Sequence, residues 1–125
     1  MPVLGMGGYF FRAKDPAALK AWYRERLGVG GGCGTDEKGE TNAHLWHTEA
    51  GPMVFEPFNA TSDYFAADKQ AMINLRVRDL AGLLAKLDAA GIKVVRKDWD
   101  TEIGNFARVH DPEDNAIELW EPPAR

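Results

Sequence analysis

The stretch RVHDPEDNAIELW, residues 108–120, carries the clearest structural signal in this sequence. Short β-prone runs at 106–110 and 116–120 predict two strands. The five residues between these runs are Asp, Pro, Glu, Asp and Asn, a composition that is typical of a turn. The stretch therefore predicts two strands that are joined by a turn in the last part of the chain.

Alternation within the last of these strands separates two faces. Ile117 and Leu119 share one side, because successive side chains of a strand alternate. Glu118 and Trp120 share the opposite side. We expect uniformly apolar sides to carry the helices, whereas a side that mixes aromatic and charged residues suits a concave ligand site. The residues expected to line that site are Phe10, Arg12, Phe58, Met72, Asn74, Arg76, Phe106, Arg108 and Trp120.

An internal repeat extends the pattern to the first half of the chain. Asp15 and Asp79 are 64 positions apart, and each precedes a segment with helical periodicity. Glu56 and Glu118 are 62 positions apart, and each follows a β-prone apolar residue. A drift of two residues over most of each copy indicates a domain of two paired modules.

The repeat predicts an α+β fold of two tandem β-α-β-β-β modules, whose curved mixed sheets enclose a cavity with the helices packed on the outer face. We expect residues 1–125 to form a single domain, with module 1 at about 6–58, a linker at 59–70 and module 2 at about 71–121. The elements expected in module 1 are strands at 8–13, 43–47 and 53–56 and a helix at 16–27. Those expected in module 2 are strands at 72–77, 92–95, 106–110 and 116–120 and a helix between Asp79 and Gly91.

The composition narrows the class of protein. The chain has 125 residues, of which 45% are hydrophobic, and a formal net charge of −4, which is ordinary for a globular domain. Its Lys and Arg residues are scattered among acids, so we expect no nucleic-acid partner and no membrane partner. No apolar run approaches the length of a membrane span, and the first residues lack the features of a signal peptide. A single cysteine, Cys33, favours the cytoplasm.

The two-module pattern and the closing Asp-Pro-x-x-Asn-x-Ile-Glu-Leu stretch resemble the vicinal oxygen chelate superfamily. This superfamily includes glyoxalase I, extradiol dioxygenases and bleomycin-resistance proteins, and the resemblance covers nearly the whole chain. Its metal-binding members take one ligand from the first and one from the last strand of each module. The resemblance therefore implies Glu56 and Glu118 as ligands. The other two positions, usually histidines, fall on Gly8 and Met72, and this puts a divalent metal cofactor in doubt.

Two hypotheses about function follow. The first is a glyoxalase-like lyase or isomerase that acts on a small oxygenated substrate, with Glu118 and Glu56 as proton carriers. In that case Arg12, Arg76 or Arg108 would stabilise an enolate-like charge. The second is a metal-free protein of the bleomycin-resistance kind, which captures a planar or cationic ligand between aromatic walls. The resemblance also implies a homodimer.

Some side chains have two interpretations at this point. Tyr64 and Phe65 lie in the linker, where they either cover the cavity or pack against a partner subunit. Trp99 lies in an expected loop at 97–102, which is either a lid or a docked loop. The glycine-rich stretch 28–34 follows a helix rather than a strand, so it predicts a flexible loop and not a phosphate-binding motif.

Overall fold

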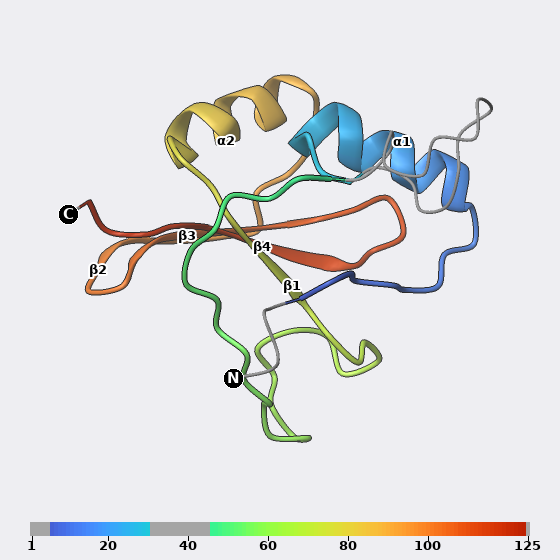
Figure 1. Cartoon of the computed structure of the whole chain (residues 1–125), viewed down its shortest axis with the longest axis horizontal. Coiled ribbons are helices and arrows are strands. Elements are labelled where there is room, and N and C mark those ends of the chain that lie inside the picture. The colour runs from blue at the N-terminus through green and yellow to red at the C-terminus, as the bar shows by residue number, and fades with distance from the viewer. Residues whose placement is uncertain (1–5, 31–45, 125) are drawn as a thin grey trace.

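Two helices and four strands make up the regular structure, which the computed structural model describes for residues 6–30 and 46–124 (Figure 1). Most of the predicted strand at 43–47 and much of the glycine-rich stretch lie outside these residues. Neither described helix is long and apolar enough to cross a membrane. In chain order the elements are α1 (Pro16–Leu27), β1 (Ile73–Arg76), α2 (Leu80–Ala89), β2 (Arg96–Thr101), β3 (Gly104–His110) and β4 (Ala116–Glu121).

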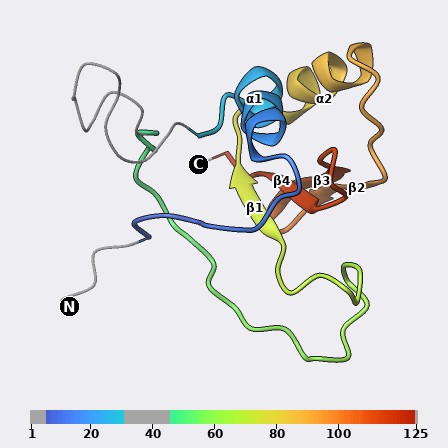
Figure 2. The ribbon, with the colours of Figure 1, turned by 90° about the vertical axis from the view of Figure 1, so that its right-hand side faces the viewer.

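The strands form one mixed sheet in the order β1-β4-β3-β2. β1 is parallel to β4, whereas β3 is antiparallel to both β4 and β2. Both helices cover the same face of this sheet, as Figures 1 and 2 show from two directions. The second half of the chain therefore has the predicted β-α-β-β-β order, and the α+β fold class is confirmed.

The core lies between the sheet and the helices. Val109, Ile117 and Leu119 are fully buried on the sheet, and Leu80 and Leu87 join the same cluster from α2. The predicted alternation in β4 is confirmed, because its apolar odd-numbered residues belong to this core. Its even-numbered residues consequently point to the face that carries no helix.

Both helices begin at the residues that the sequence predicts. Asp15 caps α1 by accepting the Ala18 N–H at 3.1 Å, and Gly28 ends that helix in the left-handed conformation, with a φ of 67°. Asp79 caps α2 by accepting the Gly82 N–H at 3.2 Å. These signals are local, so the sequence alone reveals them.

α1 comes from the first half of the chain but packs on the core of the second half. Leu19 and Tyr23 are buried in the same cluster as the sheet residues. The Tyr23 hydroxyl donates to Asp111 Oδ2 at 2.7 Å. The Glu113 carboxylate accepts two backbone N–H groups just before the helix, at 2.7 and 3.0 Å. These contacts attach α1 to the turn between β3 and β4.

The position predicted for the second strand of module 2 is wrong. Residues 92–95 form no strand, and β2 begins at Arg96 instead. Nearly all side chains of β2 are exposed, so the segment lacks the apolar alternation by which a sequence reveals a strand. Backbone pairing with β3 keeps it at the edge of the sheet. Trp99 therefore lies in a strand and not in the predicted loop.

The strands predicted for the first half differ most from the structure. The segments 8–13 and 53–56 lie in no strand. Phe10 and Phe55, which they contain, are 83% and 82% exposed. A β-prone side chain favours a strand only where a neighbouring strand and an apolar surface are present. Within the described residues these segments have no strand partner, so their propensity is not realised.

Candidate functional site

A row of polar side chains crosses the sheet on the face without helices. The strand register places Asn74 of β1 beside Glu118 of β4, and Arg108 of β3 on the other side of Glu118. Arg96 of β2 continues the row beside Arg108. Residues that are paired in register project from the same face, so four strands bring these side chains together.

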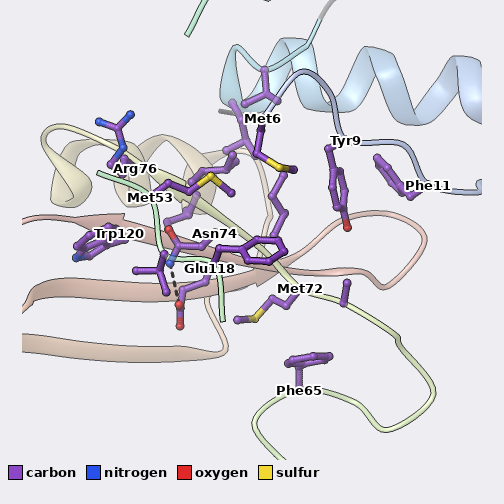
Figure 3. Close-up of a pocket in the computed structure, with 18 of the residues that line it drawn as sticks. Met6, Tyr9, Phe11, Met53, Phe65, Met72, Asn74, Arg76, Glu118 and Trp120 are labelled. Atoms are coloured by element: carbon purple, nitrogen blue, oxygen red, sulfur yellow. Dashed lines mark hydrogen bonds between the residues drawn. The ribbon is translucent and has the colours of Figure 1, made fainter. Parts of the chain in front are cut away.

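Glu118 is the buried acid of this row. It is only 8% exposed, and both of its carboxylate oxygens accept hydrogen bonds. Asn74 Nδ2 donates to Oε1 at 2.8 Å, as the dashed line in Figure 3 shows. The Tyr64 hydroxyl donates to Oε2 at 2.5 Å. Two donors on one carboxylate fix its orientation.

Arg108 is the cation next to this acid. It is also 8% exposed, and its Nη2 lies 3.9 Å from Glu118 Oε2. Its Nη1 donates to the backbone carbonyl of Tyr64. Among the described residues, Nε and Nη2 of Arg108 have no hydrogen-bond partner. A buried guanidinium with two unsatisfied nitrogens is costly for a folded protein, and such groups often mark a functional site.

Tyr64 connects these two residues, although it lies in the linker and not in the sheet. The guanidinium carbon of Arg108 lies 4.4 Å from the centre of its ring, and that of Arg96 lies 4.8 Å from it. Burial raises the pKa of Tyr64, and the hydrogen bond to Glu118 raises this pKa further. The sequence indicates an unusual aromatic residue in the linker, but it does not reveal these partners.

A second row beside the first is aromatic. The register pairs Phe106 with Trp120 and Trp120 with Arg76. The rings of Phe106 and Trp120 are nearly parallel, at 5°, with centres 6.0 Å apart. Trp120 Nε1 donates to the Ile103 carbonyl at 2.6 Å, which fixes the indole. The sheet thus offers an aromatic surface next to the buried acid.

A hollow of about 2130 Å³ opens above both rows. The sheet forms one side, and the others are formed by α1, by the segments before and after it, and by residues 46–72. Met53, Met72 and Phe65 are among the residues that line it, as Figure 3 shows. The hollow is larger than the roughly 300–1,000 Å³ of a usual ligand pocket, so its outer part is an open space rather than a fitted site.

The eleven residues predicted for the site divide into three groups. Asn74, Arg108 and Glu118 meet in the polar row, and Arg108 lies beneath Tyr64 rather than on the wall of the hollow. Arg12 is exposed and does not line the hollow. The remaining residues line the hollow without touching Glu118 through a hydrogen bond: Phe10, Glu56, Phe58, Met72, Arg76, Phe106 and Trp120.

Glu56 and Arg76 are exposed, unlike Glu118 and Arg108 of the polar row. Glu56 is exposed, in a segment that lies in no strand. Arg76 is exposed as well, and it points away from Glu118 in Figure 3. Its Nη2 donates to the backbone carbonyl of Glu49 at 2.8 Å. The buried charges of the site are therefore those of Glu118 and Arg108.

The metal that the family resemblance implies does not fit the groups around Glu118. A divalent ion needs several acceptor atoms that converge on one point. Glu118 is surrounded by donors instead, namely Asn74 Nδ2, the Tyr64 hydroxyl and, at 3.9 Å, Arg108. Among the described residues, no three His, Cys, Asp or Glu side chains lie close enough to share an ion. Gly8 has no side chain to offer.

Comparison with protein families identifies a match over most of the chain. The model of a family described as glyoxalase-like domain matches residues 9–120, which is most of the chain. No curated protein matches the chain.

Comparison with solved structures gives further likenesses. A glyoxalase family protein from Enterococcus faecalis is 25% identical, with a TM-score of 0.39, over 51% of this chain and 52% of its own. The chain thus spans about half the length of that protein. A glyoxylase/bleomycin resistance protein/dioxygenase domain from Frankia sp. is 16% identical, covers 97% of this chain and 99% of its own, and has a TM-score of 0.60. A virulence protein from Salmonella typhimurium is 16% identical over 93% of this chain and 100% of its own, with a TM-score of 0.49. The Frankia likeness supports the fold.

Proposed function

The chain belongs to the glyoxalase-like domain family, and we propose that it is a cytoplasmic enzyme that moves a proton on a small oxygenated substrate. A lyase or isomerase of this kind needs a base that removes a proton from carbon and returns it elsewhere. Glu118 is the proposed base, and the part of the hollow next to it is the proposed substrate site. Glu56, on the exposed side of the hollow, is proposed as the second carboxylate.

One observation carries this proposal: a buried carboxylate lines the hollow in a fixed orientation. Glu118 is 8% exposed and is held by donors from β1 and from the linker. A base that is already oriented needs little reorganisation when it takes a proton. Arg108, with Nη2 at 3.9 Å from this carboxylate, is the proposed cation for an enolate-like oxygen. Because Arg108 lies beneath Tyr64, this role requires the Tyr64 ring to move aside.

The test is proton exchange, because it does not require the true substrate to be known. The protein is incubated in D₂O with α-hydroxy ketones, dicarbonyls and their glutathione adducts, and deuterium incorporation at carbon is followed by NMR. We expect the protein to accelerate exchange in at least one compound. Glu118→Gln should slow this exchange about 100-fold or more, which is the usual contribution of a general base, while binding of the compound persists.

Glu102→Gln is the matched control for this experiment. Glu102 is an exposed carboxylate in the turn between β2 and β3, and it does not line the hollow. The control should exchange at the rate of the unchanged protein. Exchange that is equally fast in Glu118→Gln, or that never exceeds the rate without protein, contradicts the proposed function.

A metal-free sequestering protein is the second candidate, and the aromatic row favours it. The parallel rings of Phe106 and Trp120 offer a flat surface to a planar ligand. Phe58 adds another aromatic ring to the hollow, with its centre 5.6 Å from that of Tyr64. This candidate predicts saturable binding of a planar compound without exchange, and a loss of affinity of about tenfold or more in Trp120→Ala.

We also propose that a second copy of the chain covers the exposed apolar part of the hollow, giving a homodimer. Val54 and Phe55 are 71% and 82% exposed, and Phe10 is exposed on the neighbouring segment. Large apolar side chains that are exposed to this extent favour association. Light scattering should give a mass of two chains, and Phe55→Glu should shift it toward one. A monomeric unchanged protein contradicts this proposal.

A further inference from the structure

The Tyr64 ring lies against the sheet, where it contacts charged side chains of the kind that bind ligands. Arg108 and Arg96 lie against its ring, and Glu118 accepts a hydrogen bond from its hydroxyl. We infer that these side chains form a subsite for a planar ring that carries a hydroxyl group and an adjacent acceptor oxygen, and that Tyr64 fills it until such a ligand displaces it. The inference rests on the proposed function for the role of Glu118 and adds the class of ligand.

The charged residues that contact Tyr64 lie on strands, whereas Tyr64 itself lies in an irregular segment. Arg96, Arg108 and Glu118 stand on three neighbouring strands, in one register row. Tyr64 stands in the segment 57–72, which contains neither helix nor strand and runs below the sheet in Figure 2. Irregular segments open at a lower free-energy cost than paired strands. Release of Tyr64 would therefore leave the three partners in place.

Arg108 has hydrogen-bond donors for which Tyr64 supplies no acceptor. Its Nε and Nη2 are buried without a hydrogen-bond partner among the described residues, while Nη1 uses the Tyr64 carbonyl. A phenol has one oxygen, and in Tyr64 that oxygen is directed to Glu118. A ligand with a second oxygen beside its hydroxyl would satisfy a nitrogen of Arg108 as well. Satisfying a buried charged donor is strongly favourable, so this ligand has an advantage over Tyr64.

The charges decide between classes of planar ligand. Two guanidinium groups lie against the ring position, so a ring that bears a positive charge is repelled. The carboxylate of Glu118 favours a neutral hydroxyl donor at the ring edge over an ionised one. A carbonyl or carboxylate oxygen next to that hydroxyl suits Arg108. Salicylate carries both groups on one ring, whereas phenol and benzoate each carry one of them.

The experiment removes the occupant and measures binding by calorimetry. Tyr64→Ala should bind salicylate about tenfold or more tightly than the unchanged protein, because the site no longer has to be vacated. In this variant salicylate should also bind at least about tenfold more tightly than phenol or benzoate. Adding Glu118→Gln to Tyr64→Ala should weaken phenol, and should weaken salicylate relative to benzoate, because benzoate has no hydroxyl for Glu118 to accept.

Asp63→Ala is the matched control, since Asp63 is the preceding residue of the linker, is exposed and does not line the hollow. It should bind salicylate as the unchanged protein does. The inference is overturned if Tyr64→Ala binds no more tightly than the unchanged protein, if Asp63→Ala gains as much, or if the three compounds bind equally. The binding measurement does not require turnover. Its outcome therefore does not depend on the result of the proton-exchange experiment.

A measurement on the unchanged protein covers the case in which Tyr64→Ala does not fold. With ¹³Cζ-labelled tyrosine, the Tyr64 signal is assigned by its loss in Tyr64→Phe. Saturating salicylate should release the ring and bring the raised pKa of Tyr64 back toward its ordinary value. A Tyr64 titration that salicylate leaves unchanged overturns the inference.

Discussion

Phe55-Glu56 and Ile117-Glu118 occupy equivalent places in the internal repeat, yet they have opposite environments. Ile117 is fully buried and Phe55 is 82% exposed. Glu118 accepts two hydrogen bonds in the polar row, whereas Glu56 is exposed on a segment with no strand partner among the residues that the structure describes. The same local pattern is therefore buried and hydrogen-bonded in one half and exposed in the other.

This difference shows that neighbouring strands and helices decide whether such a pattern forms a buried strand. β4 lies between β1 and β3 and carries a helix layer on one face. The segment 53–56 has no strand beside it among the described residues. α1, by contrast, packs on the core of the second half, because Leu19 and Tyr23 are buried in it. Strand propensity is weak without these neighbours.

The largest expected effect contrasts the two apolar residues directly. Ile117→Ala should lower the free energy of unfolding by about 2–5 kcal/mol, since it leaves a cavity in the core. At a protein concentration at which the chain is monomeric, Phe55→Ala should change it by no more than about 0.5 kcal/mol. Urea denaturation followed by circular dichroism measures both. A large cost for Phe55→Ala would show that its segment is packed in solution, and the contrast would disappear.

The next effect tests how α1 is attached to the second half. Tyr23→Phe removes the donor of a 2.7 Å hydrogen bond to the buried Asp111. Asp111 keeps other donors in its turn, so we expect a loss of about 1–2 kcal/mol. Tyr9→Phe, at a residue that is 44% exposed, is the control and should cost less than about 0.5 kcal/mol. Equal unfolding midpoints for both variants would contradict this role for Tyr23.

Tyr23 should also make the free energy of unfolding depend on pH in the alkaline range. Burial raises the pKa of Tyr23, and the hydrogen bond to Asp111 raises it further. Above about pH 10 the unfolded chain releases the phenol proton while the folded chain retains it, so stability falls as pH rises. Tyr23→Phe should lose stability less steeply than the unchanged protein between about pH 10 and 11. Parallel slopes in urea titrations would contradict this assignment.

The smallest expected effect concerns the attachment of α2. Glu121 accepts Asn105 Nδ2 at 2.9 Å and the Leu80 N–H at 3.1 Å, and these bonds lower the pKa of Glu121. A lowered pKa stabilises the fold above the unfolded-state pKa, and this contribution is lost as pH falls through the folded-state value. Glu121→Gln should therefore lower the urea midpoint slightly at pH 7, and the difference should shrink in acid. A difference that is independent of pH would contradict this linkage.

The sequence allows much of the polar row to be predicted, because its residues lie on regular strands. Alternation predicts that Asn74, Arg108 and Glu118 share one face of the sheet, and the strand register brings them together. The same reasoning misses Tyr64, because a linker has no period from which the direction of a side chain follows. It also misplaces Trp99, because the exposed edge strand around it carries no apolar alternation.

The sequence by itself determined the helix starts at Asp15 and Asp79, the turn before β4 and the two faces of that strand. Each of these depends on interactions within a few residues, such as capping bonds and the alternation of side chains. Only the tertiary structure decided which β-prone segments pair, and that Tyr64 reaches Glu118 across 54 positions of the chain. Pairing and burial require partners that are distant in sequence, and local composition contains no information on where these partners lie.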